Sequence, residues 1–269
     1  MVYVLQKRKG QKRHMIVFNN VTKYYKSNVG IENVSVRINK GDFVFLVGPS
    51  GAGKSTFIKL ILKEIDADSG SIKVRGNEVT TLSNRQVPKL RRNIGIVFQD
   101  FRLLPKKTVH ENVAFAMEII HQPKKIIKKH VPQVLSMVGI ASKADKYPDE
   151  LSAGEQQRVA IARAIVNKPR ILIADEPTGN LDPDTAWEIM QLLDQINMRG
   201  TTVLMVTHAK DIVDKMGKRV IAIEKGRIVR DEFGAYGYEE ALAELDMTED
   251  TLQSKRTFRS RFKRGGDEW

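Results

Sequence analysis

The chain has no cysteine among its 269 residues, which excludes a disulfide framework. Its apolar runs are all shorter than the roughly 18–20 residues that a membrane-spanning helix needs. The first residues lack the charged segment and following apolar segment that mark a secretory signal. There is no internal repeat or low-complexity linker, and 41% apolar content is enough for a full core. These features favour one folded unit in the cytoplasm.

Acidic residues are absent from the first 14 residues, although this stretch carries five basic ones. Residues 231–252 reverse the pattern with eight acids and no base, and basic residues dominate again toward the end. Blocks of like charge are more typical of solvated tails than of packed structure. We therefore expect a basic N-terminal arm at 1–14, a folded unit at about 15–235, and an acidic then basic tail at 236–269.

A glycine-rich stretch follows the apolar run 43–47 and opens a segment with helical spacing of apolar residues. It reads Gly48-Pro49-Ser50-Gly51-Ala52-Gly53-Lys54-Ser55-Thr56. This spacing is that of a phosphate-binding loop, whose backbone N–H groups surround the phosphates of a nucleotide. Lys54 would reach the β- and γ-phosphates, and the Ser55 hydroxyl would bind Mg²⁺. A plain glycine turn is the alternative, but the strand–loop–helix context favours a nucleoside triphosphate site.

A second motif, Ile171–Glu176, has four apolar residues followed by two carboxylates. The apolar residues predict a buried strand whose carboxyl end faces the crevice where open α/β sheets bind ligands. Asp175 would hold Mg²⁺, directly or through water. Glu176 would orient or deprotonate the water that attacks the γ-phosphate. Acids that merely end a strand are the alternative, but the phosphate loop upstream favours phosphoryl transfer to water.

Strand and helix patterns alternate along the folded unit. We expect strands at 16–21, 34–38, 43–47, 71–74, 94–98, 171–175, 202–207, 220–224 and 227–229. We expect helices from 54 to about 64, from 183 to 198 and near 210–215, and a helical pattern throughout 108–145. The sum is an α/β sheet with a helical subdomain at about 100–165.

Two helical segments have defined apolar faces. In 183–198, Asp182 is the predicted N-cap, Pro183 the first residue and Gly200 the stop. The apolar stripe of that helix is Ala186, Ile189, Met190, Leu193 and Ile196. In 108–145 the predicted inward residues are Val113, Met117, Ile120, Ile126, Ile127, Val131, Val134, Leu135 and Val138.

A third motif precedes another helical pattern. It reads Leu151-Ser152-Ala153-Gly154-Glu155-Gln156-Gln157-Arg158. Small residues leading into a helix favour an anion-binding N-terminus, yet this one lies about a hundred residues from the phosphate loop. It has no evident phosphate to bind in its own chain. Two head-to-tail copies would solve the problem, because each motif would then cover the nucleotide held by the other copy's loop.

With these three motifs the chain resembles the ATP-binding subunits of the ABC superfamily, whose signature is L-S-G-G-Q. The departures are Ala153 for the first glycine and Glu155 for the glutamine. Alanine should fit with little steric loss, whereas a carboxylate near the nucleotide would weaken closure unless it points away. Ser152 and Gly154, which would meet the γ-phosphate in trans, are retained.

This resemblance implies a P-loop ATPase core, a mixed β-sheet flanked by helices, with an antiparallel β edge and a helical subdomain. It implies ATP and Mg²⁺ as ligands and a homodimer that closes on ATP. The guanine-reading pattern N-K-x-D is absent from 167–170, which disfavours GTP.

The same resemblance gives roles to single residues. Gln99 resembles the Q-loop glutamine that reaches Mg²⁺ and the attacking water. Asp182 resembles the D-loop aspartate, which would be both helix cap and dimer contact. His208 resembles the switch histidine that contacts the γ-phosphate. Tyr25 would stack on adenine, with Tyr24 as the alternative.

Within the superfamily, segments 98–113, 230–232 and 236–240 resemble the FtsE family of cell-division ATPases. The resemblance covers about 15–241. It implies an ATPase on the inner face of the cell membrane, docked on the integral membrane protein FtsX and controlling peptidoglycan hydrolases outside. The ATPase of a lipoprotein extractor or macrolide-type exporter would carry the same motifs. A soluble nucleic-acid or ribosome-associated ABC protein is the least expected, since such proteins commonly carry two cassettes.

Two further surfaces are predicted from composition. Phe101, Leu103 and Leu104 follow Gln99 and would line a groove for a short helix of a membrane partner, unless they close the subdomain core. Segment 257–264 interleaves two phenylalanines with four basic residues. This composition suits an anionic membrane surface, and a disordered end or nucleic-acid binding are its alternatives.

Overall fold

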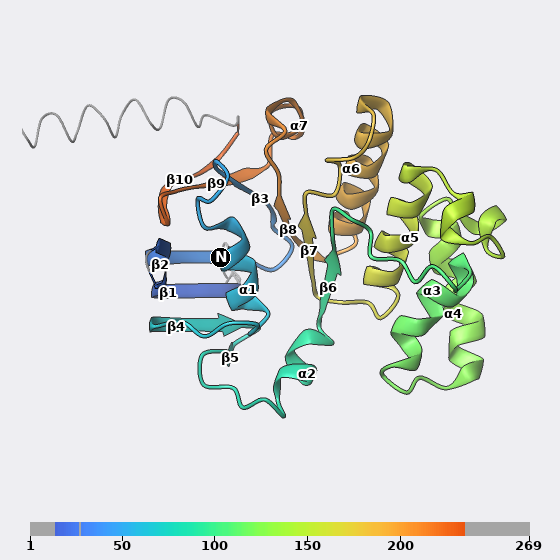
Figure 1. Cartoon of the computed structure of the whole chain (residues 1–269), viewed down its shortest axis with the longest axis horizontal. Helices are drawn as coiled ribbons and strands as arrows, with labels where there is room; N and C mark the ends of the chain where they lie inside the picture. Colours follow the sequence, from blue (N-terminus) through green and yellow to red (C-terminus); the bar gives the residue numbers. More distant parts are fainter. Residues whose placement is uncertain (1–13, 27, 235–269) are drawn as a thin grey trace, which may run out of the picture.

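The computed structural model of the chain describes residues 14–26 and 28–234, which form two β-sheets and a group of helices (Figure 1). The N-terminal arm up to residue 13 and the tail from residue 235 lie outside the described residues. The predicted membrane-binding segment 257–264 lies outside them as well. None of the helices in 14–26 and 28–234 combines the length and apolar character that crossing a bilayer requires.

The central sheet has the strand order β10-β9-β3-β8-β7-β6. Its strands are β3 (Phe43–Val47), β6 (Ile94–Val97), β7 (Ile171–Asp175), β8 (Thr202–Val206), β9 (Arg219–Glu224) and β10 (Arg227–Phe233). Strands β9, β3, β8, β7 and β6 pair in parallel, and β10 is antiparallel to β9. Phe45 and Leu46 of β3 pack into separate cores on opposite faces of this sheet. Burial on both faces explains the unbroken apolar run of β3.

A second, antiparallel sheet forms the expected β edge. Its order is β2-β1-β4-β5, with β1 (His14–Tyr25), β2 (Asn28–Asn39), β4 (Ser69–Val74) and β5 (Asn77–Glu78). Helix α1 (Lys54–Ile61) shares one hydrophobic core with both sheets. The ring of Phe57 in α1 stacks on Phe18 of β1 with centroids 4.2 Å apart. This packing fixes the position of α1 against the ends of the central strands.

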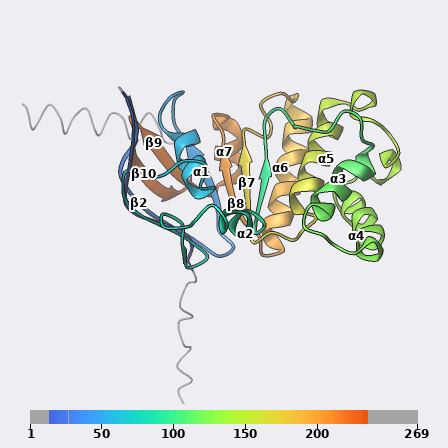
Figure 2. The same cartoon turned by 60° about the horizontal axis from the view of Figure 1, so that its bottom comes forward.

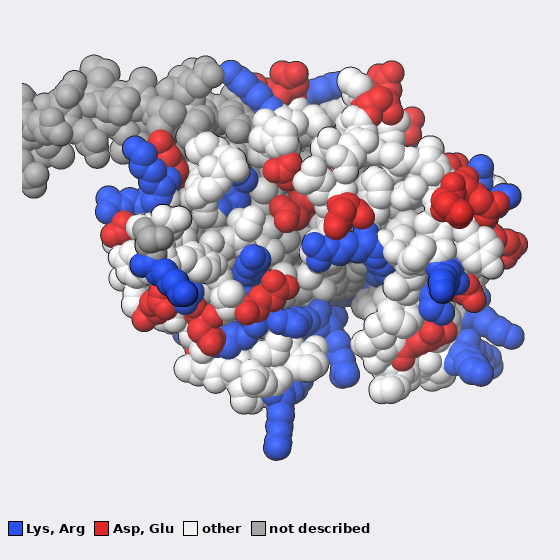
Figure 3. Space-filling view, in the orientation of Figure 1, with Lys and Arg blue, Asp and Glu red and all other residues white. Residues whose placement is uncertain are grey.

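The other face of the central sheet is covered by helices that extend beyond it (Figures 1 and 2). They are α3 (Val109–Glu118), α4 (Lys124–Met137), α5 (Ala153–Ile165) and α6 (Pro183–Met198), with short 3-10 turns at Ala141–Lys143 and Pro148–Glu150. Basic side chains gather over α4 in Figure 3, where Lys124, Lys125, Lys128 and Lys129 stand on one helix.

Some sequence predictions need correction. The segment 108–145 is two helices rather than one continuous pattern, because the chain breaks at 119–123 and α4 restarts after Pro123. Ile126 is 38% exposed instead of facing inward, because it lies beside the buried face of α4 that Ile127 and Val131 form. Ile120 lies beyond the end of α3. Helix α1 ends at Ile61, and the short elements α2 (Val87–Arg91) and β5 were not predicted.

Helix α6 matches its prediction. The Asp182 side chain accepts a hydrogen bond from the Thr185 N–H at 3.0 Å, and the predicted apolar stripe is buried. Gly200 follows with φ of 98°, a left-handed conformation that ends the helix. Helix α7 (Lys210–Met216) follows β8, close to its predicted bounds.

Candidate nucleotide site

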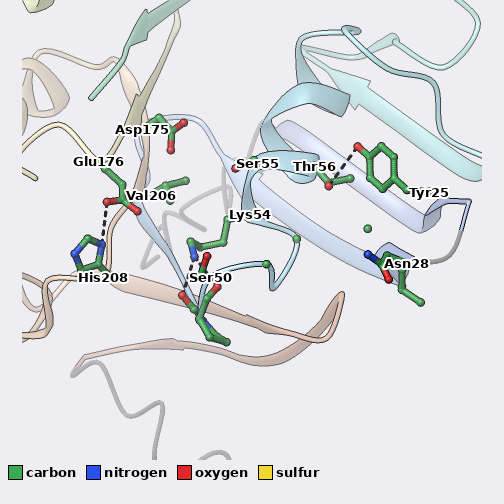
Figure 4. Close-up of a pocket in the computed structure, with 16 residues that line it drawn as sticks. Tyr25, Asn28, Ser50, Lys54, Ser55, Thr56, Asp175, Glu176, Val206 and His208 are labelled. Atoms are coloured by element: carbon green, nitrogen blue, oxygen red, sulfur yellow. Dashed lines mark hydrogen bonds and ion pairs between the residues drawn. The ribbon is translucent and has the colours of Figure 1, made fainter. Parts of the chain in front are cut away.

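Three strand ends meet at one edge of the central sheet. Strand β8 pairs with both β3 and β7, so the segments that follow β3 and β8 lie beside the end of β7. These segments are the glycine-rich loop after β3, His208 after β8, and Asp175 with Glu176 at β7. Together they line a cavity of about 660 Å³ (Figure 4). Ligand sites of open α/β sheets form at this edge.

The loop 48–53 needs glycine at two positions. Gly48 has φ of 146°, and a Cβ there would lie 2.1 Å from the Ile223 carbonyl oxygen. Gly53 has φ of 113°, and its Cβ would lie 2.3 Å from the Gly30 carbonyl oxygen. Helix α1 begins at the next residue, so its first N–H groups have no partners within the helix and can bind an anion. Of the nine predicted loop residues only Ala52 does not line the cavity.

Lys54 forms hydrogen bonds to its own loop. Its Nζ donates to the carbonyl oxygens of Gly48 at 2.7 Å and Pro49 at 2.8 Å. Burial lowers the pKa of Lys54, and the charges of Glu176 and Asp175 oppose that shift. A phosphate group would therefore offer Lys54 a charged partner in place of two carbonyl groups.

Asp175 lies half-buried beside Glu176, and burial and the neighbouring carboxylate both raise the pKa of Asp175. Two adjacent carboxylates in a partly desolvated place favour a bound cation. Hard oxygen donors, here Asp175 and the Ser55 hydroxyl, are the ligands that Mg²⁺ prefers. Within the described residues no three His, Cys, Asp or Glu side chains form a metal cluster. The residues thus fit an Mg²⁺ ion that shares its coordination with a nucleotide.

His208 and Glu176 are in direct contact (Figure 4). The Nδ1 of His208 lies 2.9 Å from Oε2 of Glu176. Glu176 has φ of 48°, a left-handed conformation that is costly for a glutamate, and its N–H donates to the Val206 carbonyl oxygen at 2.9 Å. Such strain at a residue facing a cavity is typical of a functional site.

The opposite wall of the cavity carries Tyr25. Thr56 Oγ1 donates a long hydrogen bond of 3.5 Å to the Tyr25 hydroxyl. Tyr24 does not line the cavity, and its backbone N–H donates to Asp68 instead, at 2.6 Å. Asn28 and Val29 also line this wall but were not predicted. Their only sequence signal is that they begin the strand after Tyr25.

Gln99 and Asp182 do not line the cavity. The Asn180 Nδ2 donates to the backbone oxygen of Gln99 at 3.1 Å, which ties the predicted D-loop to the predicted Q-loop. The Gln99 amide nitrogen packs against Gly179, 3.1 Å from where a Cβ would stand. In the described chain these two loops therefore touch each other beside the nucleotide cavity.

Arg163 of α5, which was not predicted, holds the Q-loop backbone. Its Nη2 donates to the Phe101 oxygen at 2.7 Å and its Nη1 to the Arg102 oxygen at 2.6 Å. Both accepting residues have positive φ, so this turn is strained. Burial lowers the pKa of Arg163, and the two carbonyl bonds compensate for that desolvation. The only sequence signal for this role of Arg163 is that it is a charged residue on a mostly apolar helix.

The signature residues 152–155 begin α5 and do not line the cavity of their own chain. Ser152 Oγ accepts from the Glu155 N–H at 3.3 Å, and Glu155 Oε2 accepts from the Ser152 N–H at 2.9 Å. This reciprocal capping box turns the Glu155 carboxylate back onto its own helix. Gly154 is packed on α6, where an added Cβ would lie 2.4 Å from the Thr185 Cγ2. The carboxylate of Glu155, which replaces the glutamine of the signature, is thus bonded at the start of its own helix.

Known proteins share this arrangement. The ABC transporter family model matches residues 31–179. The chain is 55% identical over 221 residues to the cell division ATP-binding protein FtsE of Streptococcus pneumoniae, covering 82% of this chain and 96% of that protein. It is 56% identical over 225 residues to FtsE of Bacillus subtilis, covering 83% and 99%.

A solved structure is also similar. The dimeric post-hydrolysis structure of the ATP-binding cassette MJ0796 with ADP and Pi matches with a TM-score of 0.74 and 37% identity, covering 81% of this chain and 98% of that one. Together with the phosphate loop and the acidic strand end, these similarities show that the chain belongs to the ABC transporter family and is an ATP-binding ATPase of the FtsE type.

Proposed function

We propose that this chain is the ATPase subunit of a cell-division complex, in which ATP-driven closure of a homodimer acts on a membrane protein of the FtsX type and so controls peptidoglycan hydrolases. The observation that carries the proposal is 55–56% identity to FtsE proteins over nearly their whole length. In this role the chain would sit on the inner face of the membrane, held by its partner.

The chemistry follows from the cavity. Lys54 and the N-terminus of α1 bind the phosphates of ATP, and Tyr25 stacks on the adenine. Glu176 orients the attacking water and accepts its proton, while His208 holds Glu176 and reaches the γ-phosphate. Ser55, Asp175 and Gln99 would hold an Mg²⁺ ion, which would supply positive charge to neutralise the phosphates. For Gln99 to bind the ion, its side chain has to move away from Gly179 when the site closes.

The second half of the site comes from another copy of the chain. Ser152, Ala153, Gly154 and Glu155 do not line the cavity of their own chain, and Asp182 caps the helix on which Gly154 packs. In the dimer, the N-terminus of α5 supplies N–H groups to the γ-phosphate held by the partner. The dimeric form of the MJ0796 cassette supports this arrangement.

The membrane partner docks beside the Q-loop. Phe101, Leu103 and Leu104 are half-buried, and the Leu104 backbone is held at both ends by Asn112 at 2.8 and 3.1 Å. A fixed loop with partly exposed apolar side chains suits a short partner helix. The basic tail at 257–264 would add contact with anionic lipid, a proposal that rests on the sequence alone.

The test compares two variants in membranes that contain the FtsX-type partner. Leu104→Glu should abolish sedimentation of the chain with those membranes while ATP binding persists. Ile119→Glu is the matched control, because Ile119 is 56% exposed at the end of α3 and the change is the same. Equal recruitment of both variants, or co-purification of a transporter permease instead of an FtsX-type protein, would contradict the proposal.

A further inference from the structure

A second cavity, of about 430 Å³, lies at the edge of the central sheet opposite the nucleotide site. Two of the residues that line it come just before strands of this sheet. Lys40 comes before β3, and Arg170 comes directly before β7. The nucleotide loop and Asp175 stand at the other ends of the same two strands. Because β3 and β7 each have five residues, roughly 16 Å of strand separates the two cavities.

Among the residues that the structure describes, four basic ones line this cavity and no acid does: His14, Lys40, Arg75 and Arg170. The acids nearby in sequence are engaged elsewhere, since Asp42 pairs with Arg219 at 3.3 Å and Glu78 accepts from the Ile72 N–H at 3.1 Å. Among the described residues, the Lys40 and Arg170 side chains have no ion-pair partner. The cavity is therefore a concentration of uncompensated positive charge.

Asn93 positions both arginines. Its side-chain oxygen accepts from Arg75 Nη1, and its Nδ2 donates to the Lys89 oxygen at 2.8 Å, which fixes the amide orientation. The Asn93 backbone oxygen accepts from the Arg170 N–H at 3.1 Å. One residue thus anchors the two guanidinium-bearing segments on either side of the cavity.

Arg75 occupies a costly position. It has φ of 54° and is followed by Gly76 with φ of 81°, in the two-residue turn between β4 and β5. Such turns favour Asn, Asp or Gly at the first position, because an ordinary side chain is strained there. The Arg75 N–H also donates to the Met15 oxygen at 2.7 Å, which holds the turn against β1. The strained turn is therefore held in place by this backbone hydrogen bond, and Arg75 lines the cavity.

We propose that this cavity binds a chain of two or three linked phosphate groups, free in solution or carried on a nucleotide. Guanidinium groups bind phosphate oxygens through paired charge-assisted hydrogen bonds, and two of them with a lysine suit a multiply charged anion. The volume exceeds that of one phosphate group. Within 14–26 and 28–234 no Phe, Tyr or Trp lines the cavity, so the phosphates rather than a base are recognised.

The test uses the full chain with Lys54→Ala, which removes the lysine from the nucleotide site. Calorimetric titration with tripolyphosphate should show one site per chain. Adding Arg75→Asn should weaken that binding about tenfold or more, because a charge-assisted contact is lost. Asparagine suits the left-handed turn position, so the variant should fold normally. Arg170→Gln is the second variant. It removes the other guanidinium group, and the hydrogen bond from its backbone N–H to the Asn93 oxygen remains.

Lys225→Asn is the matched control. Lys225 has φ of 45° and precedes Gly226 in the two-residue turn between β9 and β10, so the change in charge and in turn chemistry is the same. It should leave tripolyphosphate binding unchanged. A parallel titration with ATP in the same background separates the two sources, since Arg75→Asn weakens ATP binding only if nucleotide-borne phosphates enter. No tripolyphosphate binding, or equal loss with Lys225→Asn, would overturn the proposal.

Discussion

His208 Nδ1 lies 2.9 Å from Glu176 Oε2. The two residues end neighbouring strands, β8 and β7, and the strained backbone of Glu176 is held by the Val206 carbonyl group at 2.9 Å. The proposed base and the proposed γ-phosphate sensor are therefore in direct contact with each other. This link leads to the first prediction.

Glu176→Gln should keep ATP binding, because the phosphate-loop contacts are intact and the amide oxygen can still accept from His208. Hydrolysis should fall roughly 10²-fold or more, because an amide cannot accept the proton. ATP should then hold the dimer closed, which gel filtration with ATP would show. Lys54→Ala is the contrast and should lose nucleotide affinity itself. Near-normal turnover by the glutamine variant would reject the role of Glu176.

The second prediction concerns the dimer. Cysteines placed at Ser50 and Ala153 in this cysteine-free chain should form a disulfide between two subunits only when ATP closes the dimer. Non-reducing gels with and without ATP measure this directly, best in the Glu176→Gln background. Single-cysteine chains are the control. Crosslinking that ignores ATP would argue against a composite site.

The third prediction concerns Gly154, where an added methyl group would lie 2.4 Å from Thr185 Cγ2. Overpacking should cost Gly154→Ala about 1–3 kcal/mol, and the roughly 1 kcal/mol that alanine gains over glycine in a helix offsets part of it, so the free energy of unfolding should fall by up to about 2 kcal/mol. Adding Thr185→Ser removes Cγ2 and should restore most of the loss. Urea unfolding of both variants measures the effect.

This contact also changes how an interface variant is interpreted. A larger side chain at Gly154, such as aspartate, meets α6 of its own chain before it can meet a partner. Loss of activity in Gly154→Asp therefore does not by itself report on the dimer. If Thr185→Ser fails to rescue Gly154→Ala, the packing explanation is wrong.

The fourth prediction concerns acid. Hydrogen bonds from backbone N–H groups lower the pKa of Glu111, Glu155 and Asp182, which cap α3, α5 and α6. A lowered pKa in the folded state means that stability is fully present above the ordinary values of 4.5 and 3.8 and is lost as pH falls through the lower folded values. The free energy of unfolding should thus decrease steadily below about pH 4.5.

A variant isolates the contribution of one cap. Glu111→Gln keeps a side-chain oxygen for the Thr108 N–H but has no carboxyl group to titrate. It should be less stable than the parent chain at neutral pH, and the difference should shrink as pH falls toward 3. A difference that stays constant with pH would contradict the assignment to ionisation.

The sequence alone determined the parts whose pattern is local. The phosphate loop, the acidic end of β7 and helix α6 follow from residues close together in the chain, because turn chemistry, capping and apolar periodicity act over a few positions. The resemblance to ABC cassettes then named distant residues such as His208. The two helices within 108–145 were not separated, because buried apolar residues keep a helical spacing on both sides of the break at 119–123.

Only the tertiary structure decided which distant residues meet. The order β8-β7-β6 places His208 on Glu176 and Gln99 against Gly179. No local pattern identifies the partners in three further arrangements: Arg163 with the Q-loop, Gly154 with Thr185, and Arg75 with Arg170 around the basic cavity. Each depends on segments far apart in sequence, and their contact is set by how the sheets and helices pack rather than by any neighbouring residue.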